Sequence, residues 1–233
     1  MNPQYMGEHM KRRILYHGSA EIITAPTYGK GKKYKDYGQG FYCTEYLDLA
    51  REWACADGKD GYVNRYEFDE TGLCILNLSD PEYTILHWLA LVMEHRRFQI
   101  FTPMMKQGVD WLHTHFLINI DFYDVIVGNR ADDSYFSFAR AFVNNEISLS
   151  QLFQGMQMNT QGEQVVLRRQ NAFEAIQFLS FEIVDSAEYA VRRRTRDDEA
   201  CLAIRKNPDG EDGLFMRDII REEVLPNDPR LRF

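Results

Sequence analysis

The chain has few of the features that mark secreted, membrane or zinc-bound proteins. Its 233 residues contain four cysteines, Cys43, Cys55, Cys74 and Cys201, and none of them forms a C-x-x-C pair. Neither a disulfide framework nor a structural metal site is therefore expected. No apolar run approaches the ~20 residues that cross a bilayer, and residues 1–13 lack the apolar stretch of a signal peptide. We expect reduced thiols in a cytoplasmic protein that does not enter a membrane.

Positive charge is also scarce. Lysine and arginine number 27 against 35 acidic residues, which gives a net charge of −8. A broad basic surface for a nucleic-acid backbone is therefore not expected, although a local basic patch is not excluded. Hydrophobic residues make up 45% of the chain and aromatic residues 13%, which supplies a core for one large domain or two small ones.

Short strands and helices occur without regular βαβ spacing, which indicates an α+β fold. Strands are expected at 13–17, 40–44, 62–68, 73–78, 124–128, 164–168 and 175–184, and helices at 47–56, 79–96, 104–116 (interrupted by Gly108), 133–144 and 148–156. Residues 24–40, with four glycines and four lysines, are expected to form a long mobile loop outside the core. Residues 186–233 are rich in charge and are expected to form a helical appendage.

The first candidate for chemistry is Tyr16-His17-Gly18-Ser19, at the end of a predicted strand. It places an imidazole beside backbone groups that a ligand can approach closely at Gly18, where no side chain intervenes. An ordinary turn after a strand is the alternative for these residues.

The second candidate is Tyr37-Gly-Gln-Gly-Phe-Tyr-Cys-Thr44, in which two glycines precede an aromatic strand. Trp53 follows on the next predicted helix. If it faces Tyr42 across a slot, the two rings can sandwich a planar group. A glycine-rich bend and a core tryptophan remain the alternatives.

The third candidate is the polar pair Glu163-Gln164, which opens an apolar strand. Because side chains alternate along a strand, one of the two can face a cleft while the other faces solvent. A strand that simply begins with polar residues is the alternative.

In this order the three pieces resemble the signature of the ADP-ribosyltransferase superfamily, in its His-Tyr-Glu, poly(ADP-ribose)-polymerase-like branch. His17-Gly18-Ser19 matches the first motif, Gly38-Gln-Gly-Phe-Tyr42 with the helix after it matches the second, and Gln164 opens the strand of the third. The chain more closely resembles a bacterial domain-of-unknown-function family, number 3990, through segments such as 14–19, 36–44 and 123–133.

The resemblance covers about residues 13–184 and implies a split β-sheet, ADP-ribosyltransferase-like core with a helical insertion. Residues 185–233 would then form a charged C-terminal extension. The implied activity is mono-ADP-ribosyl transfer from NAD+, a glycosyltransferase reaction with NAD as co-substrate, in a bacterial intracellular toxin or regulator. A toxin of this kind would have an antitoxin-like protein partner, and the acceptor of the ADP-ribose remains open between a protein, a nucleic acid and a small molecule.

The resemblance also implies roles for single residues. His17 would bind a hydroxyl of the adenosine ribose with help from Ser19, and the backbone of Gly18 would hold the nicotinamide carboxamide. Tyr42 and Trp53 would close on the two faces of the nicotinamide. Gly40 would let the chain approach the ring. Gln164 would bind the ribose that carries the nicotinamide.

The departure from the family pattern is Gln164, because the third motif normally carries a carboxylate. Breaking the bond between nicotinamide and ribose builds positive charge on the ribose, which a carboxylate stabilises and a neutral amide does not. Losing such a contact commonly costs about 3–4 kcal/mol of transition-state stabilisation, so slow single transfer is expected rather than chain elongation. Glu163, Asp132 and Asp133 are alternative carboxylates, although the aspartate pair also fits plain charges at a helix start.

Two other functions remain open from the sequence. The same fold could hold NAD+ or an ADP-ribose ligand without chemistry, which the glutamine at 164 favours. An α+β interaction protein could instead dock a partner through its helices at 81–116 and its tail at 186–233. Arginines 192–194 and the lysines at 30–35 could bind phosphate or simply face solvent.

Overall fold

Strands of the protein form two separate sheets in the computed structural model, which describes residues 12–55, 58–131, 133–157, 163–195 and 213–232. The three-stranded sheet has the order β1-β3-β7, and the four-stranded sheet has the order β2-β6-β5-β4. The strands are β1 (Arg12–Ser19), β2 (Phe41–Cys43), β3 (Gly61–Asp69), β4 (Ile75–Asn77), β5 (Val125–Asn129), β6 (Glu163–Leu167) and β7 (Ile176–Val184). The α+β class predicted from the sequence is confirmed.

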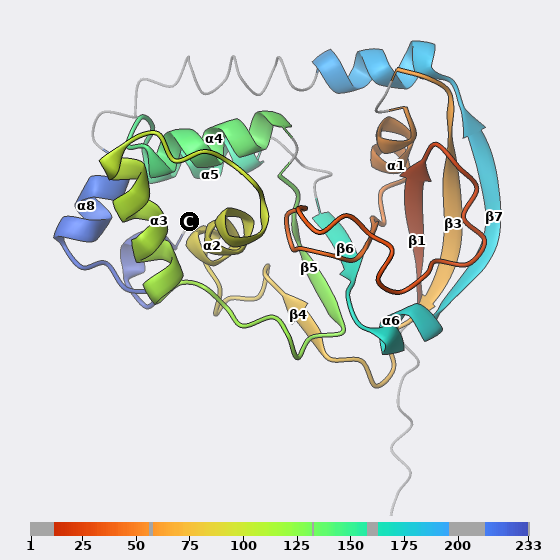
Figure 1. Ribbon diagram of the computed structural model, residues 1–233, viewed down its shortest axis with the longest axis horizontal. Coiled ribbons are helices and arrows are strands. Elements are labelled where there is room, and N and C mark those ends of the chain that lie inside the picture. The colour runs from red at the N-terminus through yellow and green to blue at the C-terminus, as the bar shows by residue number, and fades with distance from the viewer. Residues whose placement is uncertain (1–11, 56–57, 132, 158–162, 196–212, 233) are drawn as a thin grey trace, which may run out of the picture.

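The three-stranded sheet is antiparallel, and β1 lies at its edge with His17 opposite Asn64 of β3. The two sheets are joined at one point, where Tyr16 of β1 pairs with Thr44 just after β2. Because β1 otherwise ends the sheet, its outer edge is left for the next element or for a ligand. Helix α1 (Leu47–Ala54) packs against this sheet (Figure 1).

The four-stranded sheet contains the most buried strands. Residues Val125–Gly128 and Gln164–Leu167 are buried, as their apolar sequences predict for strands that are covered on both faces. In this sheet β4 and β5 run parallel, whereas β6 runs antiparallel to both β5 and β2. The four-stranded sheet lies between the three-stranded sheet and most of the helices (Figure 1).

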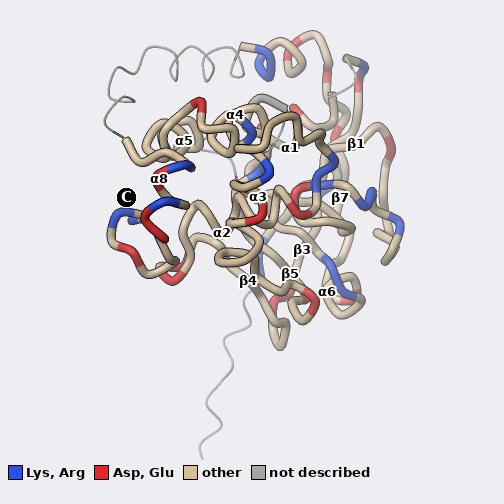
Figure 2. The backbone as a smooth tube through the Cα atoms, turned by 60° about the vertical axis from the view of Figure 1, so that its left-hand side comes forward, with Lys and Arg blue, Asp and Glu red and all other residues tan. Residues whose placement is uncertain are grey.

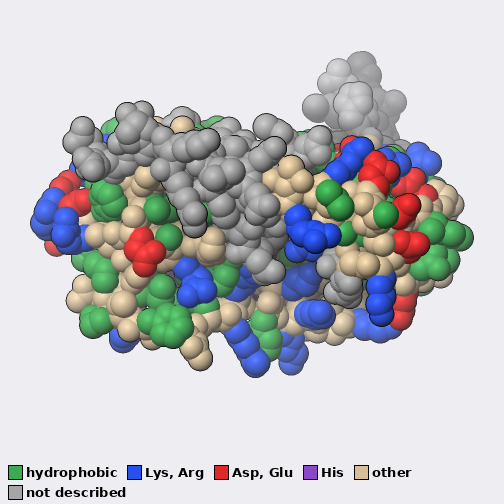
Figure 3. All heavy atoms as spheres, turned by 90° about the horizontal axis from the view of Figure 1, so that it is seen from above, with side chains coloured by type: hydrophobic (Ala, Val, Ile, Leu, Met, Phe, Trp, Pro, Cys, Tyr) green, Lys and Arg blue, Asp and Glu red, His purple; other side chains and the backbone are tan. Residues whose placement is uncertain are grey.

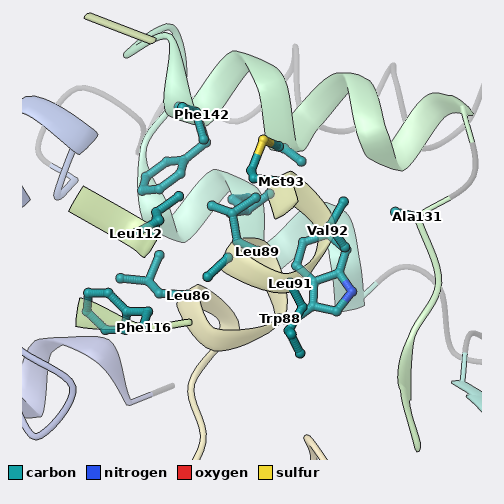
Figure 4. Close-up of a cluster of buried hydrophobic side chains, with 14 of the residues drawn as sticks. Leu86, Trp88, Leu89, Leu91, Val92, Met93, Leu112, Phe116, Ala131 and Phe142 are labelled. Carbon is teal, nitrogen blue, oxygen red and sulfur yellow. The ribbon is translucent and has the colours of Figure 1, made fainter. Parts of the chain in front are cut away.

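The helices other than α1 gather mainly on the far side of the four-stranded sheet (Figure 1). They include α2 (Ile85–His95), α3 (Pro103–His115), α4 (Asp133–Val143), α5 (Leu149–Gln157) and α8 (Met216–Arg221). Helix α2 is their centre: its residues 86–93 are all buried, and its side chains contact α3 and α4 (Figure 4). In Figure 2 the tube of α2 is accordingly almost without charged residues. None of the described helices is long and apolar enough to cross a membrane.

Two of the predicted helices differ from those observed. The helix predicted from residue 79 begins only at Ile85, because residues 79–83 form turns and Thr84 and His87 make the reciprocal cap of α2. Gly108 does not interrupt α3. A Cβ there would lie 3.0 Å from both Met216 and Val143, so the glycine lets α3 pack closely against its neighbours. The short helix α6 (Gln170–Glu174) was not predicted.

Two segments that were predicted to lie outside the core contribute to it. Residues 20–40 form no helix or strand, as expected, but Asp36, Tyr37 and Gly38 at their end are buried. Of the predicted C-terminal appendage, residues 186–195 are helical. Met216 and Ile219 of α8 are fully buried in the helical core, because their side chains complete the apolar surface that α2 and α3 leave on that side.

Candidate functional site

A cleft of about 230 Å3 brings together residues from both sheets and from several helices. Its lining residues are His17, Gly18, Lys35, Asp36, Tyr42, Trp53, Arg96, Arg130, Ala131, Gln164 and Arg193. Five of the seven residues proposed from the sequence are among them: His17, Gly18, Tyr42, Trp53 and Gln164. The polypeptide thus unites in one crevice three motifs that lie far apart along the chain.

His17 is a neutral imidazole with a defined tautomer. Its Nδ1 lies 2.6 Å from the carbonyl oxygen of Tyr42, and because a carbonyl only accepts, Nδ1 carries the proton. Nε2 is then an acceptor. Burial lowers the pKa of His17 from 6.5 to about 4, and the bond to Tyr42 opposes this effect only in part. The ring also lies against Phe41, with 4.3 Å between ring centroids.

Gly18 has two separate structural roles. A Cβ at this position would lie 1.9 Å from the carbonyl oxygen of Ala50, so the glycine is required where α1 crosses β1. Tyr16, two residues earlier, uses its N–H and C=O to pair with Thr44 across the outer edge of β1. Because backbone groups alternate between the two edges of a strand, the N–H and C=O of Gly18 lie on that same outer edge, beside the cleft.

Tyr42 is 7% exposed and lines the cleft, while its hydroxyl forms hydrogen bonds within the protein. The hydroxyl donates to the carbonyl of Gly38 at 2.7 Å and accepts from the N–H of Tyr37 at 3.1 Å. Burial raises the pKa of Tyr42 well above its usual range, so the side chain acts as a neutral ring. The ammonium group of Lys35 lies 5.3 Å from the centre of this ring. Trp53, on α1, lines the same cleft.

Ser19 and Gly40 were expected to contact the ligand, but neither lines the cleft. The hydroxyl of Ser19 donates to the carbonyl of Glu21 in the turn after β1. A Cβ at Gly40 would lie 2.7 Å from Val166, so this glycine allows β2 to pack against β6. Both residues satisfy local structure, which is the alternative that their sequence context had left open.

Gln164 and Glu163 lie on opposite faces of β6, as strand alternation predicts. Gln164 is 3% exposed and lines the cleft, whereas Glu163 accepts a hydrogen bond from the hydroxyl of Ser79 at 2.6 Å. Glu163 is not a lining residue. Asp132 lies outside the described residues, and of Asp133 the structure gives only its place at the start of α4.

Asp36 lines the cleft and was not predicted from the sequence, as is also true of Arg96, Arg130 and Ala131. Its carboxylate accepts hydrogen bonds from Nε2 of Gln164 at 2.8 Å and from the N–H of Ala131 at 2.7 Å, and it pairs with Nε of Arg96 at 3.1 Å. These partners come from β6, from the β5–α4 connection and from the end of α2. The available signal was that Asp36 opens the segment 36–44 on which the resemblance rests.

The cleft is strongly basic in a protein that is acidic overall. Lys35, Arg96, Arg130 and Arg193 line it together with a single carboxylate among the described residues, that of Asp36. Figure 3 shows lysine and arginine side chains gathered across the middle of one face of the molecule. An anionic ligand is therefore favoured in this cleft. For arginines 192–194 the sequence left open phosphate binding or a solvated face, and of the three Arg193 lines the cleft.

The remaining candidates do not form a metal site. No group of three or more metal-ligating side chains occurs within the described parts of the chain. Nε2 of His113, on α3, lies 3.6 Å from Oε2 of Glu94, on α2. His87 is buried at the start of α2.

Comparison with known protein families agrees with the closer of the two resemblances. A family profile described as "Protein of unknown function (DUF3990)" matches residues 13–178. The chain belongs to the DUF3990 family. The DUF3990 match includes every cleft residue except Arg193. No curated protein and no solved structure matches the chain.

Proposed function

We propose that this DUF3990 protein is a mono-ADP-ribosyltransferase that uses NAD+ in the cytoplasm and has an ADP-ribosyltransferase-like split sheet. The observation that carries the proposal is the single cleft lined by His17, Gly18, Tyr42, Trp53 and Gln164. The two separate sheets and the free thiols of Cys43, Cys55 and Cys74 agree with it.

Several parts of the dinucleotide have a chemically suitable partner in the cleft: the adenosine ribose, the pyrophosphate and the nicotinamide. Nε2 of His17 accepts from a hydroxyl of the adenosine ribose, and the N–H and C=O of Gly18 pair with the nicotinamide carboxamide. The nicotinamide ring stacks on Tyr42, with Trp53 on its other side. The basic side chains attract the pyrophosphate, and Nη1 of Arg96 is buried with no hydrogen-bond partner in the described structure.

The reaction breaks the bond between the nicotinamide nitrogen and C1′ of the ribose. The bonding electron pair leaves with nicotinamide, which becomes neutral, and positive charge develops on the ribose. A nucleophile of the acceptor then bonds to C1′ and loses its proton. Binding the nicotinamide and its ribose rigidly in the cleft lowers the barrier by fixing the reacting bond in place.

A binding module that holds NAD+ without chemistry is the second candidate, and the observation that favours it is the neutral Gln164. The interaction-protein alternative is less well supported, because α2 was one of its docking helices and its residues 86–93 are buried in the helical core (Figure 4).

The experiment is to incubate the purified protein with NAD+ and a bacterial lysate and to measure released nicotinamide and labelled acceptor. We expect His17→Ala and Tyr42→Ala to suppress both signals, whereas His113→Ala, outside the cleft, leaves them unchanged. Circular dichroism verifies that the variants fold. Binding of NAD+ without any nicotinamide release would leave the binding module. Absence of a thermal shift with millimolar NAD+ would exclude both candidates, because a ligand of the folded state raises its stability.

A further inference from the structure

The side chains of Asp36 and Gln164 form a buried pair at the wall of the cleft. Asp36 is 6% exposed and Gln164 is 3% exposed, and 2.8 Å separates Oδ2 of the aspartate from Nε2 of the amide. Asp36 stands in the loop before β2, and Gln164 stands in β6. No other carboxylate lines the cleft within the described parts of the chain.

The hydrogen bonds fix the orientation of the Gln164 amide. Its nitrogen faces two groups that only accept, the Asp36 carboxylate at 2.8 Å and the carbonyl of Asn129 at 3.4 Å. A flipped amide would place its oxygen against both of these acceptors, which is unfavourable. Oε1 is therefore the end of the amide that accepts from a ligand.

We infer that Asp36 is a positioning residue that acts through Gln164 and supplies the negative charge that the neutral amide lacks. This inference rests on the proposed function. In the transferase, Oε1 of Gln164 accepts from a hydroxyl of the nicotinamide ribose while the carboxylate behind it polarises the amide. Together the two side chains take the place of one glutamate.

The groups around Asp36 favour a negative charge beside the ribose and also limit how strongly that charge stabilises it. The C–N bond breaks with its electrons on nicotinamide, so the ribose becomes positive close to the pair. Asp36 is screened little by water because it is buried. Burial raises the pKa of Asp36 above its usual value, and Arg96, the N–H of Ala131 and the amide of Gln164 oppose this effect only in part. Because Arg96 neutralises part of the charge, the pair stabilises the ribose less than an exposed glutamate at 164 would, which fits slow single transfer.

The pair makes an unexpected prediction for Gln164→Glu. A glutamate added to the wild-type chain would bring two carboxylates within hydrogen-bond distance of each other, and one of them would have to hold a proton. The substitution should therefore fail to raise activity on its own. In the Asp36→Asn background the same glutamate carries the charge itself and accepts a hydrogen bond from the new amide.

The experiment compares the wild type, Asp36→Asn, Gln164→Glu and the double variant under saturating NAD+, with single-turnover nicotinamide release as the measurement. We expect each single variant to be about 10–100-fold slower than the wild type, and the double variant to recover at least the wild-type rate. Affinity for NAD+, measured by calorimetry, should change much less than the rate. Glu163→Gln is the matched control, since that neighbouring carboxylate lies outside the cleft, and it should leave the rate unchanged.

The outcomes separate this inference from the proposed function. If the wild type releases nicotinamide and Asp36→Asn is equally fast, or if the losses add in the double variant, the pair is refuted and the transferase stands. If the wild type binds NAD+ and releases nothing, the transferase and the pair are both refuted. If Asp36→Asn does not fold, Gln164→Glu decides alone: a rate at or above that of the wild type overturns the inference, and a loss of about 10-fold or more supports it.

Discussion

The half-buried, neutral imidazole of His17 leads to a prediction about stability that does not depend on the ligand. In the unfolded chain this imidazole takes up a proton as the pH falls through 6.5, whereas in the folded protein burial holds its pKa at about 4. Between these values the unfolded state binds more protons, so the free energy of unfolding falls as the pH is lowered. The stabilising contribution is complete above pH 6.5 and disappears as the pH falls through the folded pKa.

The expected size follows from the difference between the two pKa values. Each pKa unit corresponds to about 1.4 kcal/mol, so lowering the pH from about 7.5 to about 4.5 should remove roughly 2–3 kcal/mol through His17 alone. His17→Asn keeps a donor for the carbonyl of Tyr42 and has no titration in this range. Between these two pH values the free energy of unfolding of His17→Asn should therefore fall by roughly 2–3 kcal/mol less than that of the wild type. Its stability at neutral pH can be lower than that of the wild type, because the contact with Phe41 is lost.

Urea unfolding of both proteins at several pH values is the assay. Groups that titrate in both proteins cancel when the wild-type and His17→Asn curves are subtracted. His115→Asn, in the last turn of α3 and outside the cleft, is the control for histidine removal in general. Parallel curves for the wild type and His17→Asn across this range would refute the reasoning, since they would mean that His17 titrates normally in the folded protein.

Three further variants test the cleft by independent means. Tyr42→Phe keeps the ring but loses the hydroxyl that bridges Gly38 and Tyr37. We expect the free energy of unfolding to fall by about 1–3 kcal/mol, with little change in the affinity for NAD+. A large loss of affinity would contradict the structural role of the hydroxyl. Gly18→Ala should destabilise the protein by about 1–3 kcal/mol and abolish NAD+ binding, because the methyl group collides with α1. If calorimetry instead gives this variant the affinity of the wild type for NAD+, α1 must adjust to the methyl group. Arg193→Ala should weaken ADP-ribose binding most at low salt, whereas Arg192→Ala, which removes the partner of Glu188 at 2.6 Å, should not; equal effects would exclude a specific role for Arg193.

Much of the fold could be predicted because its signals are local. Alternation of apolar residues predicted β3, and continuous apolar runs predicted β5 and β6. The predicted start of α2 was wrong because Ser79-Asp80-Pro81 has the residues typical of a helix start but forms turns, and the cap is made by Thr84, directly before Ile85. Gly108 was misjudged because its effect depends on neighbours from α4 and α8, which the sequence around it does not reveal.

The cleft could be predicted only in part. The motifs around His17, Tyr42 and Gln164 were identified from their own residues and order. Asp36 was not identified, because a single aspartate in a glycine- and lysine-rich loop is typically exposed to solvent. Arg96 and Arg193 stood in charged stretches that looked equally ordinary.

The sequence by itself determined the strands, most of the helices, the DUF3990 membership and the opposite facing of Glu163 and Gln164, because periodicity and motif order are properties of neighbouring residues. Only the tertiary structure decided which charge stands behind Gln164. The Asp36 carboxylate lies there because a loop, the end of a helix and a strand come together in the folded protein. These segments are far apart in the chain, so no local sequence pattern predicts their contacts.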